Sequence, residues 1–161
     1  NNVLTIALAI CKSLTKEEYN DMLKQEVTNR SYLFGRLLAI YEMIESATYN
    51  SGEQDRVTNA EKYWTAYIQN PKTTMLVLER NTNSYKNKLQ SNPTKRGLAI
   101  KYDREKNIIC SLLDQHYFGT VEENKALSAD FLYGYYAEKN YLFSRNEVEN
   151  KFEKVEEEVN D

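Results

Sequence analysis

Glycine and proline are scarce in this chain. Together they account for 7 of its 161 residues, well below the roughly 12% of average proteins. Because many-stranded folds depend on these residues for their turns, a β-sandwich or β-barrel is excluded. The hydrophobic fraction of 41%, with 13 tyrosines and 5 phenylalanines, is too high for a disordered chain. The length allows one domain with a hydrophobic core.

Long apolar segments are also missing. The longest uninterrupted apolar run, Ile6 to Cys11, is far shorter than the roughly 20 residues of a transmembrane helix, and the mean hydropathy is −0.71. Cys11 and Cys110 lie within apolar stretches, which favours buried thiols in a reducing compartment. We therefore expect a cytoplasmic protein with no membrane partner. Because the sequence begins with Asn1 and shows no signal peptide, we expect a trimmed chain or a piece of a longer one.

Motifs that carry catalytic chemistry are absent too. His116 is the only histidine, and neither cysteine is close to it in sequence, so no metal site is predicted. There is no glycine-rich phosphate loop and no G-x-S-x-G motif. Paired carboxylates such as Glu122-Glu123 lie in charge-rich, solvated contexts, where a general acid would not gain a raised pKa. We expect no catalytic residue, no cofactor and no small-molecule substrate, and hence no enzyme.

Apolar residues recur at the 3.6-residue spacing of helices along most of the chain. Two neighbouring stripes over residues 33–44 predict a deeply buried helix. A narrower stripe over residues 148–159 is surrounded by charged side chains. The stripe residues, in chain order, are Leu33, Phe34, Leu37, Leu38, Ile40, Tyr41, Ile44, Met75, Leu78, Tyr85, Leu89, Ile109, Leu112, Leu113, Val148, Phe152, Val155 and Val159.

Helix start signals divide these stripes into separate elements. Capping boxes, in which a Thr or Ser is followed three residues later by Glu, occur at Thr15, Thr58 and Ser144. Asn70-Pro71 is typical of a helix cap followed by a first-turn proline. Several helices joined by short connections are therefore expected.

These signals predict an all-α fold. We expect a single-domain helical bundle of about six or seven helices over residues 1–143, with loops near 50–55 and 91–97. Residues 144–161 are expected to form an acidic C-terminal helix or tail, which is either peripheral or needs a partner.

Two glycines fall inside predicted helices. Gly35 and Gly134 each cost their helix roughly 1 kcal/mol relative to alanine. The usual compensation is the close approach of a neighbouring helix, and this is our interpretation. Approach of a ligand backbone is the alternative.

Charge is unevenly distributed along the chain. The formal net charge is −3, yet residues 71–106 contain nine basic and three acidic residues, a local charge of +6. Such a block attracts phosphate despite the overall sign; alternatively, it is a solvated face balanced by the acidic C-terminal segment. Tyr85 and Tyr102 are the tyrosines best placed to stack on nucleotides. The candidate nucleic-acid-binding residues are Lys72, Arg80, Lys86, Lys88, Lys95, Arg96, Lys101, Arg104 and Lys106.

Three sequence blocks resemble one known family, and in the same order. Residues 31–42 (SYLFGRLLAIYE) resemble the Y-L-x-G-R-L-x-A-x-x-E stretch in the C-terminal region of the type I-C (Dvulg subtype) CRISPR-associated Cascade large subunit. Residues 56–64 (RVTNAEKYW), followed by Asn70-Pro71, resemble the next segment of that family. Residues 127–136 (LSADFLYGYY) are similar to its closing L-G-Y-Y helix.

The resemblance implies a C-terminal domain equivalent to the family's internally translated small subunit, acting in antiviral defence. It implies Cascade backbone and large subunits as partners, together with the R-loop of crRNA and target DNA, including the displaced single strand. The +6 segment is then expected to contact nucleic-acid backbone and stabilise the R-loop, because base pairing supplies the sequence specificity. The alternative is a structural docking domain that bridges Cascade subunits without direct DNA contact.

Some residues fit this picture less directly. Arg30, Arg36 and Arg56 are basic residues outside the +6 segment, and we favour Arg36 as an internal ion-pair partner. The family often has glutamine and arginine after the paired tyrosines, where this chain has Glu138 and Lys139.

Overall fold

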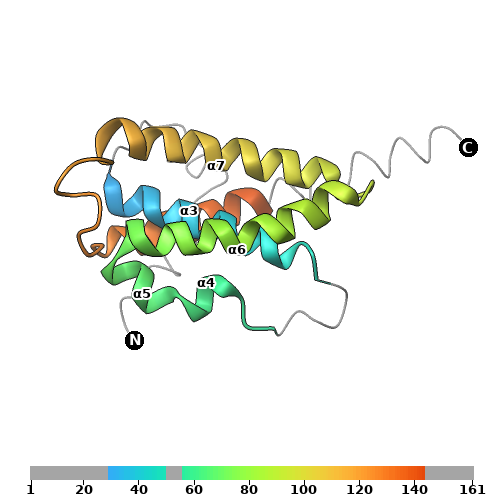
Figure 1. Cartoon of the computed structure of the whole chain (residues 1–161), viewed down its shortest axis with the longest axis horizontal. Coiled ribbons are helices and arrows are strands. Elements are labelled where there is room, and N and C mark those ends of the chain that lie inside the picture. The colour runs from blue at the N-terminus through green and yellow to red at the C-terminus, as the bar shows by residue number, and fades with distance from the viewer. Residues whose placement is uncertain (1–28, 50–55, 144–161) are drawn as a thin grey trace, which may run out of the picture.

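The computed structural model describes residues 29–49 and 56–143, and every regular element in this part of the chain is a helix. The helices are α3 (Arg30–Ser46), α4 (Asn59–Lys62), α5 (Trp64–Gln69), α6 (Pro71–Ser91) and α7 (Arg96–His116), followed by a closing helix over residues 130–143. The all-α fold class is confirmed (Figure 1). The capping boxes at Thr15 and Ser144, the loop 50–55 and the acidic segment 144–161 lie outside the described residues.

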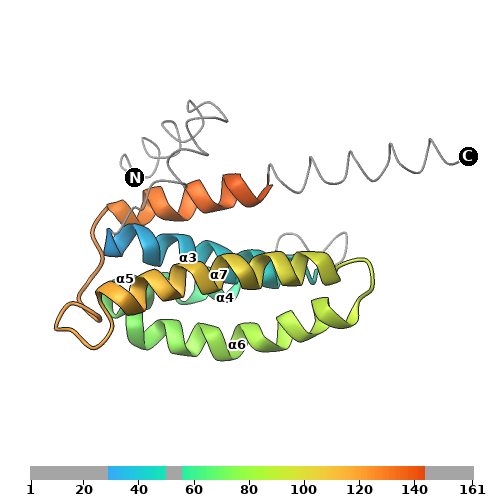
Figure 2. The same ribbon diagram turned by 90° about the horizontal axis from the view of Figure 1, so that it is seen from above.

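Helix α3 forms the centre of the bundle. Both of its predicted stripes are buried, and Leu33, Phe34, Leu37, Leu38 and Ile40 are all 0% exposed. Burial of each such side chain stabilises the fold by about 1.5–3 kcal/mol. Figure 2 shows α3 between the closing helix and the hairpin formed by α6 and α7. The Asn29 side chain accepts a hydrogen bond from the amide of Tyr32 and caps the helix.

The connection between α3 and α6 is partly as predicted. The capping box of Thr58 and Glu61 is present at the start of α4. The single helix expected after it is interrupted at Tyr63, where φ is −96° and ψ is 6°. Pro71 occupies the first turn of α6 and Asn70 is the N-cap residue, both as predicted; the Asn70 carbonyl accepts from the Thr74 amide, whereas its side chain makes no capping hydrogen bond. Asn70 also ends α5, since its amide donates to the Ala66 carbonyl.

The closing helix packs directly on α3, and two glycines make this possible. A Cβ atom at Gly35 would lie 2.0 Å from the Phe131 carbonyl oxygen, and one at Gly134 would lie 2.0 Å from that of Tyr32. Both positions therefore exclude any side chain, which confirms close helix packing as the reason for these glycines. Trp64 contacts the same crossing with its ring edge-on to Phe131, at a centroid distance of 5.0 Å.

A buried ion pair joins the same two helices. The Nε atom of Arg36 lies 2.6 Å from a carboxylate oxygen of Glu138, which is 0% exposed. A second guanidinium nitrogen lies 3.8 Å from Glu105 on α7. Burial raises the pKa of Glu138, and the nearby Arg36 only partly offsets this effect. The internal ion pair favoured for Arg36 is confirmed, and it links three helices through one side chain.

Candidate nucleic-acid interface

The +6 segment folds into the α6–α7 hairpin. Between Glu79 and Asp103 the chain contains six basic residues and no acidic residue. The two helices are joined by a short turn, in which the Asn92 side chain accepts a hydrogen bond of 3.0 Å from the amide of Thr94. The end of the hairpin that contains this turn is therefore the most positively charged part of the segment.

At least four of the nine candidate residues make contacts within the protein, namely Lys72, Lys86, Lys95 and Lys106. Lys106 is only 8% exposed, and its Nζ atom lies 2.6 Å from Glu79. Burial lowers the pKa of Lys106, but the Glu79 carboxylate more than compensates and leaves the pKa raised. Lys86 lies 3.0 Å from Asp103, and the Lys72 ammonium lies 3.1 Å from the ring centroid of Phe118. These contacts hold the hairpin together.

The two candidate tyrosines differ in their exposure. Tyr102 is 1% exposed and belongs to the hydrophobic core, so its ring has no free face on which a base can stack. Tyr85 is half-buried, and the Nζ atom of Lys88 lies 5.6 Å from its ring centroid. Of the pair, only Tyr85 adjoins the solvent-exposed basic side chains.

The exposed candidates are distributed along the hairpin rather than gathered in one groove. Arg80, Lys88, Arg96 and Arg104 are exposed, whereas Lys101 is half-buried on α7. At 1.5 Å per residue, Lys88 and Arg96 lie within about 6 Å of the turn along the helix axes, while Arg80 and Arg104 lie roughly 14–18 Å from it. Lys88 and Arg96 therefore both lie near the turn, whereas Arg80 and Arg104 lie further along the hairpin.

Residues from outside the hairpin extend this basic region. Lys95 donates a hydrogen bond of 2.8 Å to the Ala47 carbonyl, which fixes the turn against the end of α3. Just beyond that point, the guanidinium of Arg56 lies 5.6 Å from the ring centroid of Tyr49. Arg56 is exposed and Tyr49 is half-buried. We call the resulting region the turn surface and define it as Tyr49, Arg56, Tyr85, Lys88, Lys95 and Arg96.

Tyr49 was not singled out from the sequence. Its hydroxyl donates a hydrogen bond of 2.6 Å to Glu45, and the other carboxylate oxygen of Glu45 accepts from the amide of Asn59. Partial burial raises the pKa of Tyr49, and the hydrogen bond to Glu45 raises it further. The ring is therefore held in place beside Arg56. Basic side chains next to fixed aromatic rings are able to bind phosphates and stack on unpaired bases.

The other arginine outside the hairpin has a structural role. Arg30 donates hydrogen bonds of 2.9 and 3.0 Å to the carbonyls of Lys125 and Ala126, and its guanidinium lies 5.8 Å from the ring centroid of Phe34. Arg30 thus attaches the segment before the closing helix to α3. Of Arg30, Arg36 and Arg56, only Arg56 joins the turn surface.

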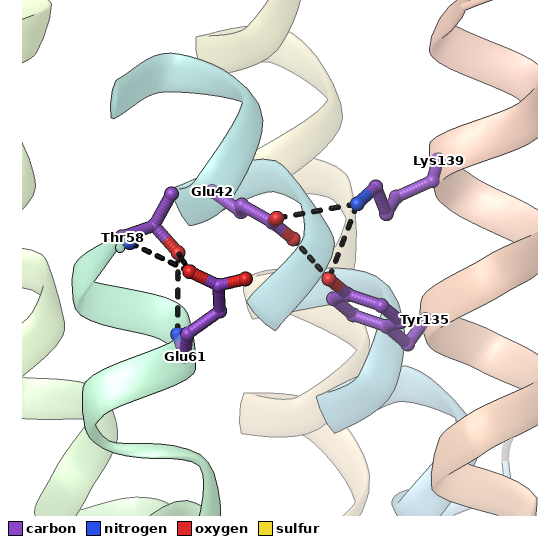
Figure 3. A network of polar contacts seen from close by, with 5 residues as sticks. All are labelled: Glu42, Thr58, Glu61, Tyr135 and Lys139. Atoms are coloured by element: carbon purple, nitrogen blue, oxygen red, sulfur yellow. Dashed lines mark hydrogen bonds and ion pairs between the residues drawn. The ribbon is translucent and has the colours of Figure 1, made fainter. Parts of the chain in front are cut away.

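A separate polar cluster lies between α3 and the closing helix (Figure 3). Tyr135 donates a hydrogen bond to Glu42, and the Lys139 ammonium lies 3.2 Å from the second oxygen of that carboxylate. Burial, followed by the charge of Glu42, raises the pKa of Tyr135. The capping box of Thr58 and Glu61 lies nearby (Figure 3). The polar groups of this cluster pair with one another and join α3 to the closing helix.

The remaining sequence candidates can also be placed. His116 is exposed at the end of α7, and Cys110 carries a free thiol whose pKa is raised by burial. Cys11 lies outside the described residues. Within residues 29–49 and 56–143 no group of three or more His, Cys, Asp or Glu side chains is arranged to hold a metal ion. No helix in this same part of the chain is long and apolar enough to span a membrane.

Comparison with known proteins adds one finding. The family described as CRISPR-associated protein (Cas_Csd1) matches residues 3–143, which is well over half of the chain. No curated protein matches the chain. The matched region includes all of the described residues and ends where the described part of the closing helix ends.

Proposed function

Because the chain belongs to the CRISPR-associated Csd1 family and is therefore a component of type I-C Cascade, we propose that it contacts nucleic-acid backbone within that complex and stabilises the R-loop. In this proposal it is equivalent to the small subunit of the complex and acts in antiviral defence in the cytoplasm. Its partners are the Cascade backbone and large subunits, and the R-loop of crRNA and target DNA with the displaced single strand.

One observation carries the proposal. Six basic residues and no acidic one lie between Glu79 and Asp103, and this stretch passes through the turn surface, where Arg56, Lys88 and Arg96 are exposed. Exchange of a DNA duplex for an RNA–DNA heteroduplex is nearly balanced in free energy, so a few phosphate contacts are enough to shift it. Sequence-independent contacts of this kind are what an exposed set of lysine and arginine side chains provides.

We further propose that this role is non-catalytic. Among the buried charged groups of the described residues, Arg36 and Glu138 pair with each other. The Glu42 carboxylate is engaged by Tyr135 and Lys139. These paired charged groups stabilise helix packing. The proposed contacts to nucleic acid require only basic side chains for the phosphates and aromatic rings for the bases.

The test is charge reversal at the turn surface in the assembled complex. We choose Lys88→Glu with Arg96→Glu, because both side chains are exposed. Lys86 and Lys95 are left unchanged, since they bond to Asp103 and to the Ala47 carbonyl and their reversal would disturb the fold. R-loop formation on target DNA is expected to weaken by about tenfold or more.

The matched control reverses two other exposed lysines, Lys62→Glu with Lys125→Glu; Lys125 pairs with Glu122 at the surface, and such an exposed ion pair contributes little to stability. This control changes the net charge by the same amount, so any effect of overall charge appears in both variants. Complex assembly is checked by size-exclusion chromatography. If both variants assemble and form R-loops as well as the wild type, direct contact is refuted and the docking domain without DNA contact is favoured.

A further inference from the structure

Tyr49 and Tyr85 place two aromatic rings among the exposed cations of the turn surface. The Arg56 guanidinium lies 5.6 Å from the ring centroid of Tyr49, and the Lys88 ammonium lies 5.6 Å from that of Tyr85. Both rings are half-buried, whereas both cations are exposed. The turn surface therefore contains two ring–cation pairs. In each pair the cation suits a phosphate and the ring suits the flat face of a base.

The two pairs come from separate parts of the chain but lie close together. Tyr49 follows the end of α3, and Tyr85 belongs to α6. Burial and the hydrogen bond to Glu45 raise the pKa of Tyr49, and the Tyr85 hydroxyl raises it further, an effect that requires the two hydroxyls to be near each other. Lys95 links the same elements through its hydrogen bond to the Ala47 carbonyl. The fold thus gathers both rings at one end of the hairpin.

A buried carboxylate fixes the ring of Tyr49. Glu45 is only 3% exposed. One of its oxygens accepts a hydrogen bond of 2.6 Å from the Tyr49 hydroxyl, and the other accepts one of 2.8 Å from the Asn59 amide. Because the ring is already held in place, it has little side-chain freedom to lose when a ligand binds. Glu45 is therefore a positioning residue for Tyr49.

We propose that Tyr49 and Tyr85 stack on unpaired bases of a single nucleic-acid strand whose phosphates are held by the neighbouring cations. This inference rests on the function proposed above and deepens it, because phosphate contacts alone do not read whether bases are paired. In a duplex each base is stacked between its neighbours, whereas an unpaired base offers its face to an aromatic side chain. The rings of the turn surface thus add a contact that only an unpaired strand provides.

The experiment measures the affinity of the full chain for labelled DNA probes by fluorescence anisotropy. The probes are a short oligothymidylate, an abasic strand of the same length and the matching duplex. The abasic strand keeps the phosphates but lacks the bases, and the base faces of the duplex are covered. We expect the wild type to bind the oligothymidylate about fivefold or more tightly than the abasic strand.

Tyr49→Leu is the test variant, because it removes the ring and keeps an apolar side chain. Tyr85 is left unchanged, since it packs against the hydrophobic core. Tyr49→Leu is expected to lower the affinity for oligothymidylate by about fivefold or more and to leave the affinity for the other two probes unchanged. Tyr49→Phe retains the ring and should keep the affinity for oligothymidylate within about threefold of the wild type.

Tyr133→Leu is the matched control. Tyr133 is also half-buried, but it lies at the opposite end of α3, because the neighbouring Gly134 packs against the backbone of Tyr32. From Tyr32 to the end of α3 at Ser46 the helix extends roughly 21 Å. Tyr133→Leu is therefore expected to bind all of the probes as the wild type does.

Every other result overturns stacking by Tyr49. Equal affinity of the wild type for the two single strands means that the bases are not bound. A Tyr49→Leu protein that binds oligothymidylate as tightly as the wild type, or that loses affinity equally for all of the probes, means that the ring does not contact a base. Phosphate binding by the turn surface still stands in these cases if reversal of Lys88 and Arg96 weakens binding. A wild type that binds none of the probes refutes the proposed function as well.

Discussion

Replacement of Gly35 by alanine tests the packing that positions the closing helix. The added methyl group would lie 2.0 Å from the Phe131 carbonyl oxygen and 2.8 Å from the Tyr135 amide nitrogen. Both are backbone atoms, so no side chain can rotate away, and the two helices must separate by about 1 Å to restore a normal contact. A gap of 0.5–1 Å forfeits a quarter to a half of the dispersion energy across it.

The expected magnitude follows from two opposing effects. Overpacking in a well-packed core costs about 1–3 kcal/mol and occasionally more, and a rigid backbone obstacle corresponds to the upper part of that range. Alanine has a higher helix propensity than glycine, and this stabilises the variant by up to about 1 kcal/mol. We therefore expect Gly35→Ala to reduce the free energy of unfolding by about 2 kcal/mol, which lowers the Tm by about 4–8 °C for a chain of this length.

Urea denaturation followed by far-ultraviolet circular dichroism measures this difference. Gly97→Ala is the matched control, because Gly97 lies in the first turn of α7 and a Cβ there has no atom within 4 Å. That control is expected to stabilise the protein by about 0.4–1 kcal/mol. A Gly35→Ala protein as stable as Gly97→Ala would refute the close crossing of α3 and the closing helix.

Two further predictions concern charged residues. Arg36→Met leaves the Glu138 carboxylate buried without its cation and is expected to lower the free energy of unfolding by about 3–5 kcal/mol, as measured by thermal denaturation. Adding Glu138→Leu is expected to restore part of that stability, and a double variant with no recovery would contradict the ion pair as the cause of the loss. Partial burial raises the pKa of Asp103, but hydrogen bonds and charges from Lys86 and Lys106 outweigh this and lower it below 3.8. The contribution of Asp103 to stability is therefore present above that pH and lost as the pH falls through the lowered value. In urea denaturation, Asp103→Asn is expected to lower the free energy of unfolding by about 0.5–1 kcal/mol at pH 7 and to leave it unchanged near pH 2. An equal loss of stability at the two pH values would contradict the ion pair.

The sequence predicted the core of the fold well, because the helical period depends only on local spacing. Both stripes of α3 are buried, and Gly35 and Gly134 mark the helix crossing. The break at Tyr63 was missed, since no glycine or proline marks it. Asn70 was correctly predicted as the N-cap of α6, although its side chain makes no capping hydrogen bond and the same residue also ends α5.

The candidate interface was only partly predictable. Charge counting found the basic hairpin, but the burial of a given side chain depends on how each helix is rotated about its axis. Tyr102 and Lys106, four residues apart on α7, both face the interior. Tyr49 was missed because it lies 36 positions before Tyr85 in sequence, and only the tertiary fold brings the end of α3 to the hairpin turn.

The salt dependence of single-stranded DNA binding tests the central claim most directly. For single strands, the slope of log affinity against log salt concentration changes by about 0.7 for each phosphate contact. If Lys88 and Arg96 both hold phosphates, replacing them with glutamine should lower the magnitude of the slope by about 1.4, while glutamine at Lys62 and Lys125 leaves it unchanged. An unaltered slope in the Lys88→Gln/Arg96→Gln protein would contradict a nucleic-acid interface at the turn surface.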